Sequence, residues 1–386
     1  MTERLKYGMI GGGPGAFIGA VHRAAIRLNN NADLVCANFT SKTEKCEECV
    51  GFGAELGIDP ARIYTSFEEM AAAEGARSDK IDWVTIVTPN AFHYPAAKAF
   101  LEQGISVVSE KPLCFSTEEG LDLKRIADEN SCLFGVTYTY TGHVMTREAR
   151  QLVRNGVIGE VRMVMGEYPQ DWLLDMLETI TPENAPWRAK PKLSGRGAAV
   201  ADLGTHIENW VNYVTGLKIE KLACNLDVFG EGGVLDNNVE ALVKFKGGAT
   251  GIYWTSQVAI GFDNALKIRI FGDKGTLEFV QEENNYLKVT LRGKPPQIYS
   301  RGAGYLTPEA SKYVRVPGGH PEGLTEAFAN IYLDFAAALN DKKSGKAVCE
   351  DDYGYPTLEQ GISGVEFFNK CVDSHEAGAS WVNLDY

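Results

Sequence analysis

The chain has 386 residues, 44% hydrophobic and 23% charged, which is ordinary for a globular protein of one large or two smaller domains. Its 38 basic and 51 acidic residues give a formal net charge of −13, which argues against nucleic acid or an anionic membrane as the main partner. No apolar run approaches the roughly 18 residues of a membrane-spanning helix, and the N-terminus lacks a signal peptide's apolar core, so we expect a cytoplasmic protein.

The first third of the chain alternates strand-like and helix-like segments, which predicts βαβ units and a parallel sheet with helices on both faces. The expected strands are Leu5–Ile10, Leu34–Phe39, Ile81–Val87, Ser106–Ser109 and Leu133–Val136. The expected helices are Ala16–Leu28, Lys42–Leu56, Tyr94–Gln103 and Glu118–Glu129.

After about Thr137 the pattern changes to short β-rich segments separated by turn residues, which predicts a second, mainly antiparallel sheet. The expected strands are Val161–Glu167, Leu222–Val228, Val239–Phe245, Ala249–Ser256, Leu266–Phe271 and Leu287–Thr290. Hairpin turns are expected at Phe245–Gly251 and Phe271–Thr276, and later helices at Gly323–Asn340 and Leu358–Ser374.

A glycine-rich stretch follows the first expected strand and opens the first expected helix. Gly11-x-Gly13-x-x-Ala16 fits the dinucleotide fingerprint, in which two glycines allow a tight turn and close approach of a pyrophosphate. Pro14 suits the start of a helix, and Gly13-x-Gly15-x-x-x-Gly19 is an overlapping variant of the same pattern. A glycine turn without a ligand is the alternative.

The segment after the second strand lacks the acidic residue that usually reads the adenosine ribose of NAD. Ser41 could bond a ribose hydroxyl or a 2′-phosphate, and Lys42 could favour the phosphate. Because no arginine fork is present, and arginine is the better phosphate clamp, we predict NAD over NADP.

Two stretches carry side chains suited to oxidation of an alcohol. Lys111 comes directly after the fourth parallel strand, where ligands bind in such sheets, and could favour an alkoxide, although a surface lysine is an equal alternative. Asp202 and His206 are four residues apart on an expected helix from about Ala201. A carboxylate beside an imidazole suits a general base, whereas a helix cap and a buried histidine are the structural alternative.

Polar and aromatic residues gather in two further places, which suit either a polyhydroxylated ring or a domain interface. They are Gln170, Asp171 and Trp172 after an expected strand, and Trp187 with Arg188. His320 lies in a glycine-rich loop, where on its own it is better explained as a surface residue. The spacing of Cys46 and Cys49 could serve a metal or a redox pair, but with no second pair nearby a helix surface explains it better, and we expect no metal site.

These motifs together resemble the Gfo/Idh/MocA family, the group of glucose–fructose oxidoreductase and inositol dehydrogenase. The resemblance covers essentially the whole chain and rests on GGGPGAFIG near the start, on Val87–Pro112 and on Gly197–Trp210. It implies a Rossmann domain over residues 1–136, followed over residues 137–386 by an α+β domain with an open-faced, mainly antiparallel sheet. That second domain would bind substrate and form a homo-oligomer, a dimer or tetramer.

The resemblance also assigns residues. The family's catalytic lysine falls on Lys111, and its aspartate and histidine fall on Asp202 and His206. Residues expected to bind the cofactor are Gly11, Gly13, Pro14, Gly15, Ala16, Phe17, Ile18, Ser41, Lys42, Thr88, Asn90, His93, Glu110, Lys111, Trp187 and Arg188. Residues expected to bind substrate are Lys111, Tyr140, Gln170, Asp171, Trp172, Asp202, His206 and His320. Tyr140 lies in Thr139–Gly142, where many members have Asn-Tyr-Arg-Phe.

The function expected from this resemblance is reversible oxidation of a ring secondary alcohol of a sugar, glycoside or cyclitol to a ketone. Two alternatives stay open. Some relatives use bound NAD transiently to break a glycosidic bond by oxidation and elimination, and others are cofactor-sensing proteins without catalysis.

Overall fold

The computed structural model describes residues 4–39, 47–177, 179, 181, 186–230 and 233–386. The chain forms two compact units, which are described separately. The first contains the described part of Met1–Thr139 together with Phe328–Gly361, and the second contains Tyr140–Ala327 together with Ile362–Tyr386. Among the described residues, no helix combines the length and the apolar character needed to cross a membrane.

The first unit is built on a five-stranded parallel sheet in the order β2-β1-β3-β4-β5. Its strands are β1 (Leu5–Gly11), β2 (Ala32–Asn38), β3 (Trp83–Val87), β4 (Ser106–Ser109) and β5 (Phe134–Val136). β3 and β4 are buried at every position, as expected of strands covered on both faces. The predicted parallel sheet is therefore confirmed, with strand ends within two residues of the predicted ones.

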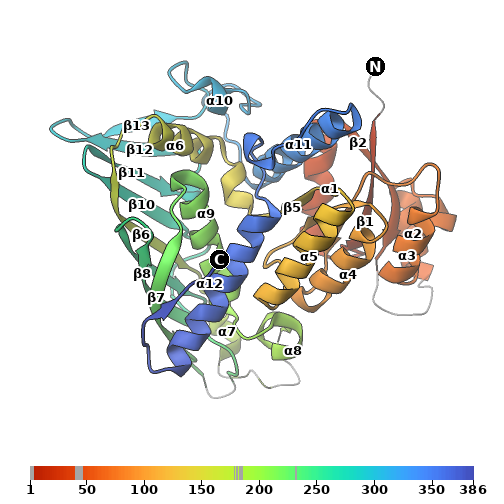
Figure 1. Cartoon of the computed structure of the whole chain (residues 1–386), viewed down its shortest axis with the longest axis horizontal. Coiled ribbons are helices and arrows are strands. Elements are labelled where there is room, and N and C mark those ends of the chain that lie inside the picture. Colours follow the sequence, from red (N-terminus) through yellow and green to blue (C-terminus); the bar gives the residue numbers. More distant parts are fainter. Residues whose placement is uncertain (1–3, 40–46, 178, 180, 182–185, 231–232) are drawn as a thin grey trace. The chain divides into compact units, whose positions relative to one another are not determined.

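Helices of the first unit follow the strands in chain order (Figure 1). They are α1 (Phe17–Asn29), α2 (Glu47–Glu55), α3 (Phe67–Gly75), α4 (His93–Leu101), α5 (Thr117–Glu129) and most of α11 (Leu324–Lys343). Short 3-10 turns lie at Pro60–Arg62, Asn90–Phe92 and Glu350–Asp352. The start predicted for α2 lies outside the described residues. α3 was not predicted, although Ser66, whose hydroxyl accepts a hydrogen bond from the Glu69 amide, begins it with a capping signal.

The second unit contains a nine-stranded sheet in the order β13-β12-β11-β10-β6-β9-β8-β7-β14. Its strands are β6 (Val161–Pro169), β7 (Ile219–Asp227), β8 (Asn238–Phe245), β9 (Thr250–Ser256), β10 (Lys267–Gly272), β11 (Gly275–Val280), β12 (Tyr286–Leu291), β13 (Gln297–Ser300) and β14 (Val382–Asn383). Only β6 and β9 pair in parallel among these described strands, so the prediction of a mainly antiparallel sheet is confirmed. The two predicted hairpins join β8 to β9 and β10 to β11.

Helices cover one face of this sheet, where α6, α9 and α12 lie (Figure 1). The helices of the second unit are α6 (Val144–Arg154), α7 (Leu174–Leu177), α8 (Pro191–Ser194), α9 (Thr205–Thr215), α10 (Pro308–Ser311) and most of α12 (Leu358–Glu376). Further helical turns lie at Thr139–Gly142, Trp187–Ala189, Val200–Gly204 and Gln281–Glu283. Trp210 of α9 stacks on Phe279 of β11, and Tyr253 of β9 contacts Phe367 of α12.

The opposite face of the sheet, called the open face below, carries no described helix (Figure 1). It presents Met163, Leu242 and Ile252, which are 38%, 49% and 44% exposed, whereas Tyr253 on the covered face is 2% exposed. Leu242 and Ile252 are direct cross-strand neighbours. Side chains therefore alternate between the two faces along β9, and an apolar surface remains uncovered.

Candidate functional site

The glycine-rich turn after β1 adopts a backbone that side chains disfavour. Gly11, Gly12 and Gly15 have φ angles of 78°, 66° and 74°. A Cβ atom on Gly13 would lie 2.8 Å from the carbonyl oxygen of Phe39, just past β2, whereas one on Gly15 would meet no described atom within 4 Å. The turn therefore needs its glycines for conformation, and at Gly15 it leaves its outer side open to a ligand.

The closest approach between the turn and α1 lies at Gly12 and Gly19. A Cβ atom on Gly19 would lie 2.3 Å from the Cα atom of Gly12. In the dinucleotide fingerprint the third small residue, here Ala16, has this packing role, but Ala16 is the half-buried N-cap residue of α1. The overlapping pattern that ends at Gly19 describes the contact better, because Gly19 lies one helical turn further along.

Replacing Gly19 by alanine is expected to cost about 1–3 kcal/mol of unfolding free energy, because the added methyl group must push α1 away from the turn. The same displacement should weaken dinucleotide binding about tenfold or more. Urea denaturation and titration with NAD test both effects. Ala20→Ser at the exposed neighbouring position serves as the control, and wild-type affinity in the Gly19 variant would contradict the prediction.

The residues present fit a dinucleotide. No described side chain caps the N-terminus of α1, so its first amides can face a phosphate, with Phe17 exposed and Ile18 half-buried beside them. Pro14 is exposed on the turn itself. β1 lies between β2 and β3, so the strand order reverses there, which is where dinucleotides bind in open α/β sheets. Ser41 and Lys42 lie outside the described residues.

The loop after β3 is tied to the loop after β4 through His93. Its ring nitrogens lie 2.9 Å from the carbonyl oxygen of Thr88 and 2.7 Å from that of Pro112. Burial lowers the pKa of His93, and the two carbonyl oxygens oppose that shift. Asn90 is buried in the 3-10 turn between them. Thr88, Asn90 and His93 therefore all follow the carboxyl end of β3, and His93 fixes their loop against the loop after β4.

Lys111 follows β4, and the carboxylate of Glu110 before it belongs to a buried network. His22 of α1, itself fully buried, contacts Glu110 Oε1 at 2.9 Å and the hydroxyl of Tyr332 at 2.6 Å. Thr137 Oγ1 donates to the same carboxylate at 2.6 Å. Burial raises the pKa of Glu110, but the hydrogen bond from His22 and the charge of Lys111 outweigh it and lower the pKa to about 2. The lysine is therefore preceded by a fixed, ionised carboxylate.

In the second unit, the segment that carries Asp202 is a π-helical turn, Val200–Gly204, which continues into α9. Such turns alter the residue spacing of a helix and are frequent at functional sites. The predicted α-helical alignment of Asp202 with His206 therefore does not describe this segment. The turn is anchored by Asp236, whose buried carboxylate accepts hydrogen bonds from the amides of Ala198 and Val200 at 2.6 and 2.7 Å.

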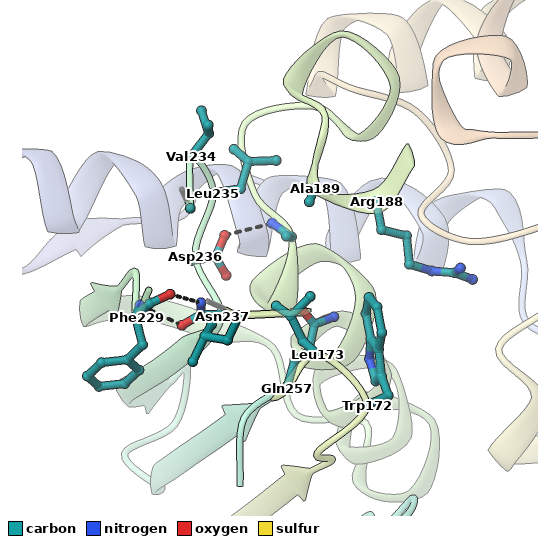
Figure 2. Close-up of a pocket in the computed structure, with 13 residues that line it drawn as sticks. Trp172, Leu173, Arg188, Ala189, Phe229, Val234, Leu235, Asp236, Asn237 and Gln257 are labelled. Carbon is teal, nitrogen blue, oxygen red and sulfur yellow. Dashed lines mark hydrogen bonds between the residues drawn. The ribbon is translucent and has the colours of Figure 1, made fainter. Parts of the chain in front are cut away.

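Asp202 lies beside two polar side chains, Arg188 and Gln257. Its Oδ2 atom lies 3.6 Å from Arg188 Nε and 3.4 Å from Gln257 Nε2. The Arg188 guanidinium also lies over the ring of Trp187, so within this predicted cofactor pair it is Arg188 that contacts the predicted catalytic aspartate. Figure 2 shows Arg188 and Gln257 among the residues that line a small pocket. Most other lining side chains are apolar, and of the whole lining only Trp172 and Arg188 were predicted as binding residues. The lining also includes Leu173, Leu177, Ala189, Ala198, Phe229, Gly233, Val234, Leu235, Asp236 and Asn237.

His206 lies against two tyrosine rings. Its ring centroid is 4.7 Å from that of Tyr140 and 5.9 Å from that of Tyr168, and the tyrosine hydroxyls are hydrogen-bonded to each other. Tyr168 also bonds Asn264, which in turn bonds Gln170. The structure therefore brings His206, Tyr140 and Gln170 together, and their role in substrate binding stays a prediction. Asn264 was missed, because a single asparagine in a loop carries no sequence signal.

The other predicted substrate residues have different surroundings. Asp171 Oδ2 accepts a hydrogen bond from the amide of Gly261 at 3.1 Å, and Trp172 is 38% exposed. His320 is exposed in a loop whose carbonyl oxygens are held by the buried guanidinium of Arg301. Among the described residues, no side-chain hydrogen bond, ion pair or ring contact joins His320 to the other candidates, so its assignment stays a prediction.

Glu208, on α9, is buried, and its two carboxylate oxygens have different surroundings. Its Oε1 atom accepts a hydrogen bond from Ser363 at 2.8 Å, while Oε2 has no hydrogen-bond partner among the described residues. Burial raises the pKa of Glu208 to about 7, although the Ser363 bond opposes the shift. The folded protein therefore holds a proton that the unfolded chain releases near pH 4.3.

This proton makes stability depend on pH. Between about pH 4.3 and 7 the folded state binds more protons than the unfolded state, so the unfolding free energy falls as pH rises. Glu208→Gln stays neutral and should gain up to about 3 kcal/mol over the wild type between pH 4.5 and 7.5. Urea denaturation at pH 4.5 and at pH 7.5 checks this. Glu220→Gln, at an exposed position near the start of β7, is the control. An equal difference in unfolding free energy between the Glu208 variant and the wild type at the two pH values would contradict the prediction.

Within the part of the chain that the structure describes, no group of three or more His, Cys, Asp or Glu side chains could hold a metal ion. Cys49 is buried, and Cys46 lies outside the described residues. The described side chains give no ligand set for metal-assisted chemistry.

Two protein-family models match the chain. The oxidoreductase family with an NAD-binding Rossmann fold matches residues 5–138, and the GFO/IDH/MocA C-terminal domain matches residues 146–278. The chain belongs to the Gfo/Idh/MocA oxidoreductase family. The resemblance inferred from the sequence motifs is confirmed, and the sheet that carries the glycine turn belongs to the family's NAD-binding Rossmann domain.

Known relatives span the full length of this family member. It is 34% identical to the uncharacterized oxidoreductase YfiI of Bacillus subtilis (strain 168), over 100% of this chain and 98% of that protein. An oxidoreductase from Sinorhizobium meliloti is 41% identical, with a TM-score of 0.87 over 99% of this chain and 100% of that chain. An inositol dehydrogenase homolog from Azotobacter vinelandii, complexed with NADH and myo-inositol, is 34% identical. Its TM-score is 0.92, over 100% of this chain and 98% of that chain.

Proposed function

We propose that this oxidoreductase converts a ring secondary alcohol of a sugar, glycoside or cyclitol to a ketone with NAD. The surroundings of His206 support this most directly, because a buried imidazole beside hydrogen-bonded hydroxyl and amide groups suits a polyhydroxylated substrate. The similarity to the Azotobacter vinelandii homolog, which binds NADH and myo-inositol, supports the same substrate class.

In this proposal His206 takes the proton of the reacting hydroxyl as general base. Asp202 orients the base and favours its protonated form, and Arg188 and Gln257 hold the Asp202 carboxylate. Lys111 donates a hydrogen bond to the reacting oxygen and stabilises its developing negative charge. When bound, the nicotinamide cofactor supplies the hydride acceptor.

The cofactor would be held by the glycine turn, with its pyrophosphate at the N-terminus of α1. The residues proposed to bind it are those of the turn and α1 start, from Gly11 to Ile18, with Thr88, Asn90, His93, Glu110 and Lys111, and Trp187 and Arg188. We propose NAD rather than NADP, and parallel titrations of the apoprotein with both would decide. Tighter binding of NADP would refute the choice.

We also propose a homo-oligomer of twofold symmetry that covers the open face. Leu242, Ile252 and Met163 form an exposed apolar centre, and ion pairs such as Arg269 with Glu167 lie on the same face. An apolar centre with a charged surround is typical of interfaces. Light scattering should give a multiple of the 42.2 kDa chain mass, and a monomer with and without NAD would refute the proposal.

A substrate panel tests the proposed reaction. Inositols, hexoses and alkyl or aryl glucosides are incubated with NAD, and absorbance at 340 nm and released aglycone are followed separately. Net NADH without aglycone release supports the dehydrogenase. Aglycone release without net NADH would instead indicate cleavage by oxidation and elimination, and the absence of both with every compound would refute the proposed function.

A further inference from the structure

His22 is a fully buried histidine on α1, the helix proposed to hold the pyrophosphate at its N-terminus. Its ring packs against Phe328 of α11, with ring centroids 4.6 Å apart. Nδ1 lies 2.6 Å from the Tyr332 hydroxyl, and Nε2 lies 2.9 Å from Glu110 Oε1. All of these residues belong to the first unit. His22 is therefore held in one orientation, and its charged partner is the residue directly before Lys111.

The two oxygens of the Glu110 carboxylate have different partners. Oε1 accepts a hydrogen bond from Thr137 Oγ1 at 2.6 Å. Because an ionised carboxylate can only accept hydrogen bonds, His22 Nε2 is the donor in the second contact to Oε1. Oε2 accepts from the backbone amide of Lys111 at 3.3 Å, and the Glu110 side chain is only 13% exposed. The carboxylate thus ties α1 and the residue after β5 to the backbone of Lys111.

His22 also helps to keep Glu110 ionised. Burial raises the pKa of Glu110, and the hydrogen bond from His22 is the largest of the opposing effects, which together lower the pKa to about 2. The other titratable groups that face Glu110 are Lys111, Tyr332 and His93 of α4. Burial raises the pKa of Tyr332 and lowers that of His93, so both are neutral near about pH 7. Without His22, burial would meet less opposition, and Glu110 would take up a proton at a higher pH.

We propose that His22 is a positioning residue for Lys111, which it serves by holding the Glu110 carboxylate in one place and in its ionised form. This inference rests on the proposed function, in which Lys111 acts on the reacting oxygen. The contact also ties the helix proposed to receive the pyrophosphate to the segment that carries the lysine. A small displacement of either would separate the lysine from the reacting oxygen, and such misplacements cost rate.

The first test compares His22→Leu with His22→Gln on the ring alcohol that the panel oxidises fastest. Leucine removes the donor to Glu110, and kcat should fall about 10- to 100-fold. Glutamine can still donate through its amide nitrogen, so its kcat should stay within a few fold of the wild type. NAD affinity should change little in either variant, because the glycine turn is untouched. The matched control is Tyr64→Phe, which removes a buried hydrogen bond to the Glu74 carboxylate in the same unit and should keep the wild-type kcat.

The pH dependence separates positioning from a merely structural role. In His22→Leu, Glu110 should take up a proton as the pH falls from about 8 to about 5, whereas in the wild type it stays ionised because its pKa is about 2. The ratio of variant to wild-type kcat should therefore fall with the pH over this range. The ratio should lose its pH dependence when Glu110→Gln is introduced into both proteins. A merely structural role for His22 would give a ratio that does not change with pH.

A second variant covers the case that His22→Leu does not fold. Thr137→Val removes the other donor to Oε1 with little change of shape, and its kcat ratio to the wild type should show the same fall with pH. A ratio that stays constant with pH in both variants, or wild-type kcat in the folded His22→Leu protein, would overturn the inference. If Lys111→Ala is impaired and His22→Leu is not, the inference alone fails. If no ring alcohol of the panel is oxidised, the proposed function fails instead.

Discussion

Replacing Lys111 by alanine is expected to lower kcat for ring-alcohol oxidation by about 1,000-fold, because a donor aimed at a developing oxyanion contributes on that scale. The position supports this expectation. Lys111 follows a buried parallel strand, and the ionised carboxylate of Glu110 is fixed beside its backbone by His22 and Thr137. Steady-state rates at saturating NAD and substrate measure the effect.

Two controls separate this role from general damage. Lys98→Ala removes a partly exposed lysine that pairs with Asp122 in the same unit, and it should leave kcat within a few fold. The Lys111 variant should unfold at nearly the wild-type urea concentration and should regain part of its rate with added ethylamine. Near-wild-type turnover in the folded Lys111 variant would contradict the proposed mechanism.

Much of the first unit was predictable because its signals are local. Buried runs such as Trp83–Val87 and Ser106–Ser109 leave few alternatives to a parallel sheet, and the glycine turn marks the carboxyl edge where its ligand binds. The alternation of exposed and buried side chains in the second sheet was also predictable, since neighbouring residues such as Ile252 and Tyr253 must face opposite sides of a strand. The periodicity of apolar residues predicts which face of a helix or strand is buried, and this is enough to assign the fold class.

The network around Lys111 could not be predicted, because it joins residues far apart in the chain. His22, Glu110 and Tyr332 come from α1, the end of β4 and α11, and each alone is an ordinary polar residue in the sequence. Asn264 is a similar case, since its three hydrogen-bond partners all lie more than 90 residues before it in the chain. Hydrogen bonds between segments that are distant in the chain produce no periodic pattern in the sequence.

Helix α6 was not predicted, and its charged residues show a second reason why a sequence pattern can miss an element. Arg147 and Glu148 are buried, although such side chains usually face solvent. Arg147 lies over the ring of Tyr313 at 3.7 Å, and Glu148 accepts hydrogen bonds from Thr307. A sequence pattern assigns such side chains to solvent, because the partners that satisfy them lie on a distant segment.

Replacing His206 by alanine is expected to lower kcat for alcohol oxidation by about 100- to 10,000-fold, the range usual for loss of a positioned base. The imidazole is 7% exposed and contacts two tyrosine rings, and a water molecule that filled the space left by alanine would be a much weaker base. The wild-type kcat/KM should decline at low pH, where a histidine base is protonated, and this decline should be absent from the residual activity of the variant.

Imidazole added to the His206→Ala variant should restore part of the rate, because it can enter the space left by the side chain and accept the same proton. NAD affinity should change little, since the glycine turn that holds the pyrophosphate in the proposal is untouched. His375→Ala is the matched control, because its ring accepts a hydrogen bond from the amide of Leu226 and has no proposed role in catalysis. If the His206 variant keeps the low-pH decline and gains nothing from imidazole, the base must be another group, and the assignment of His206 is wrong.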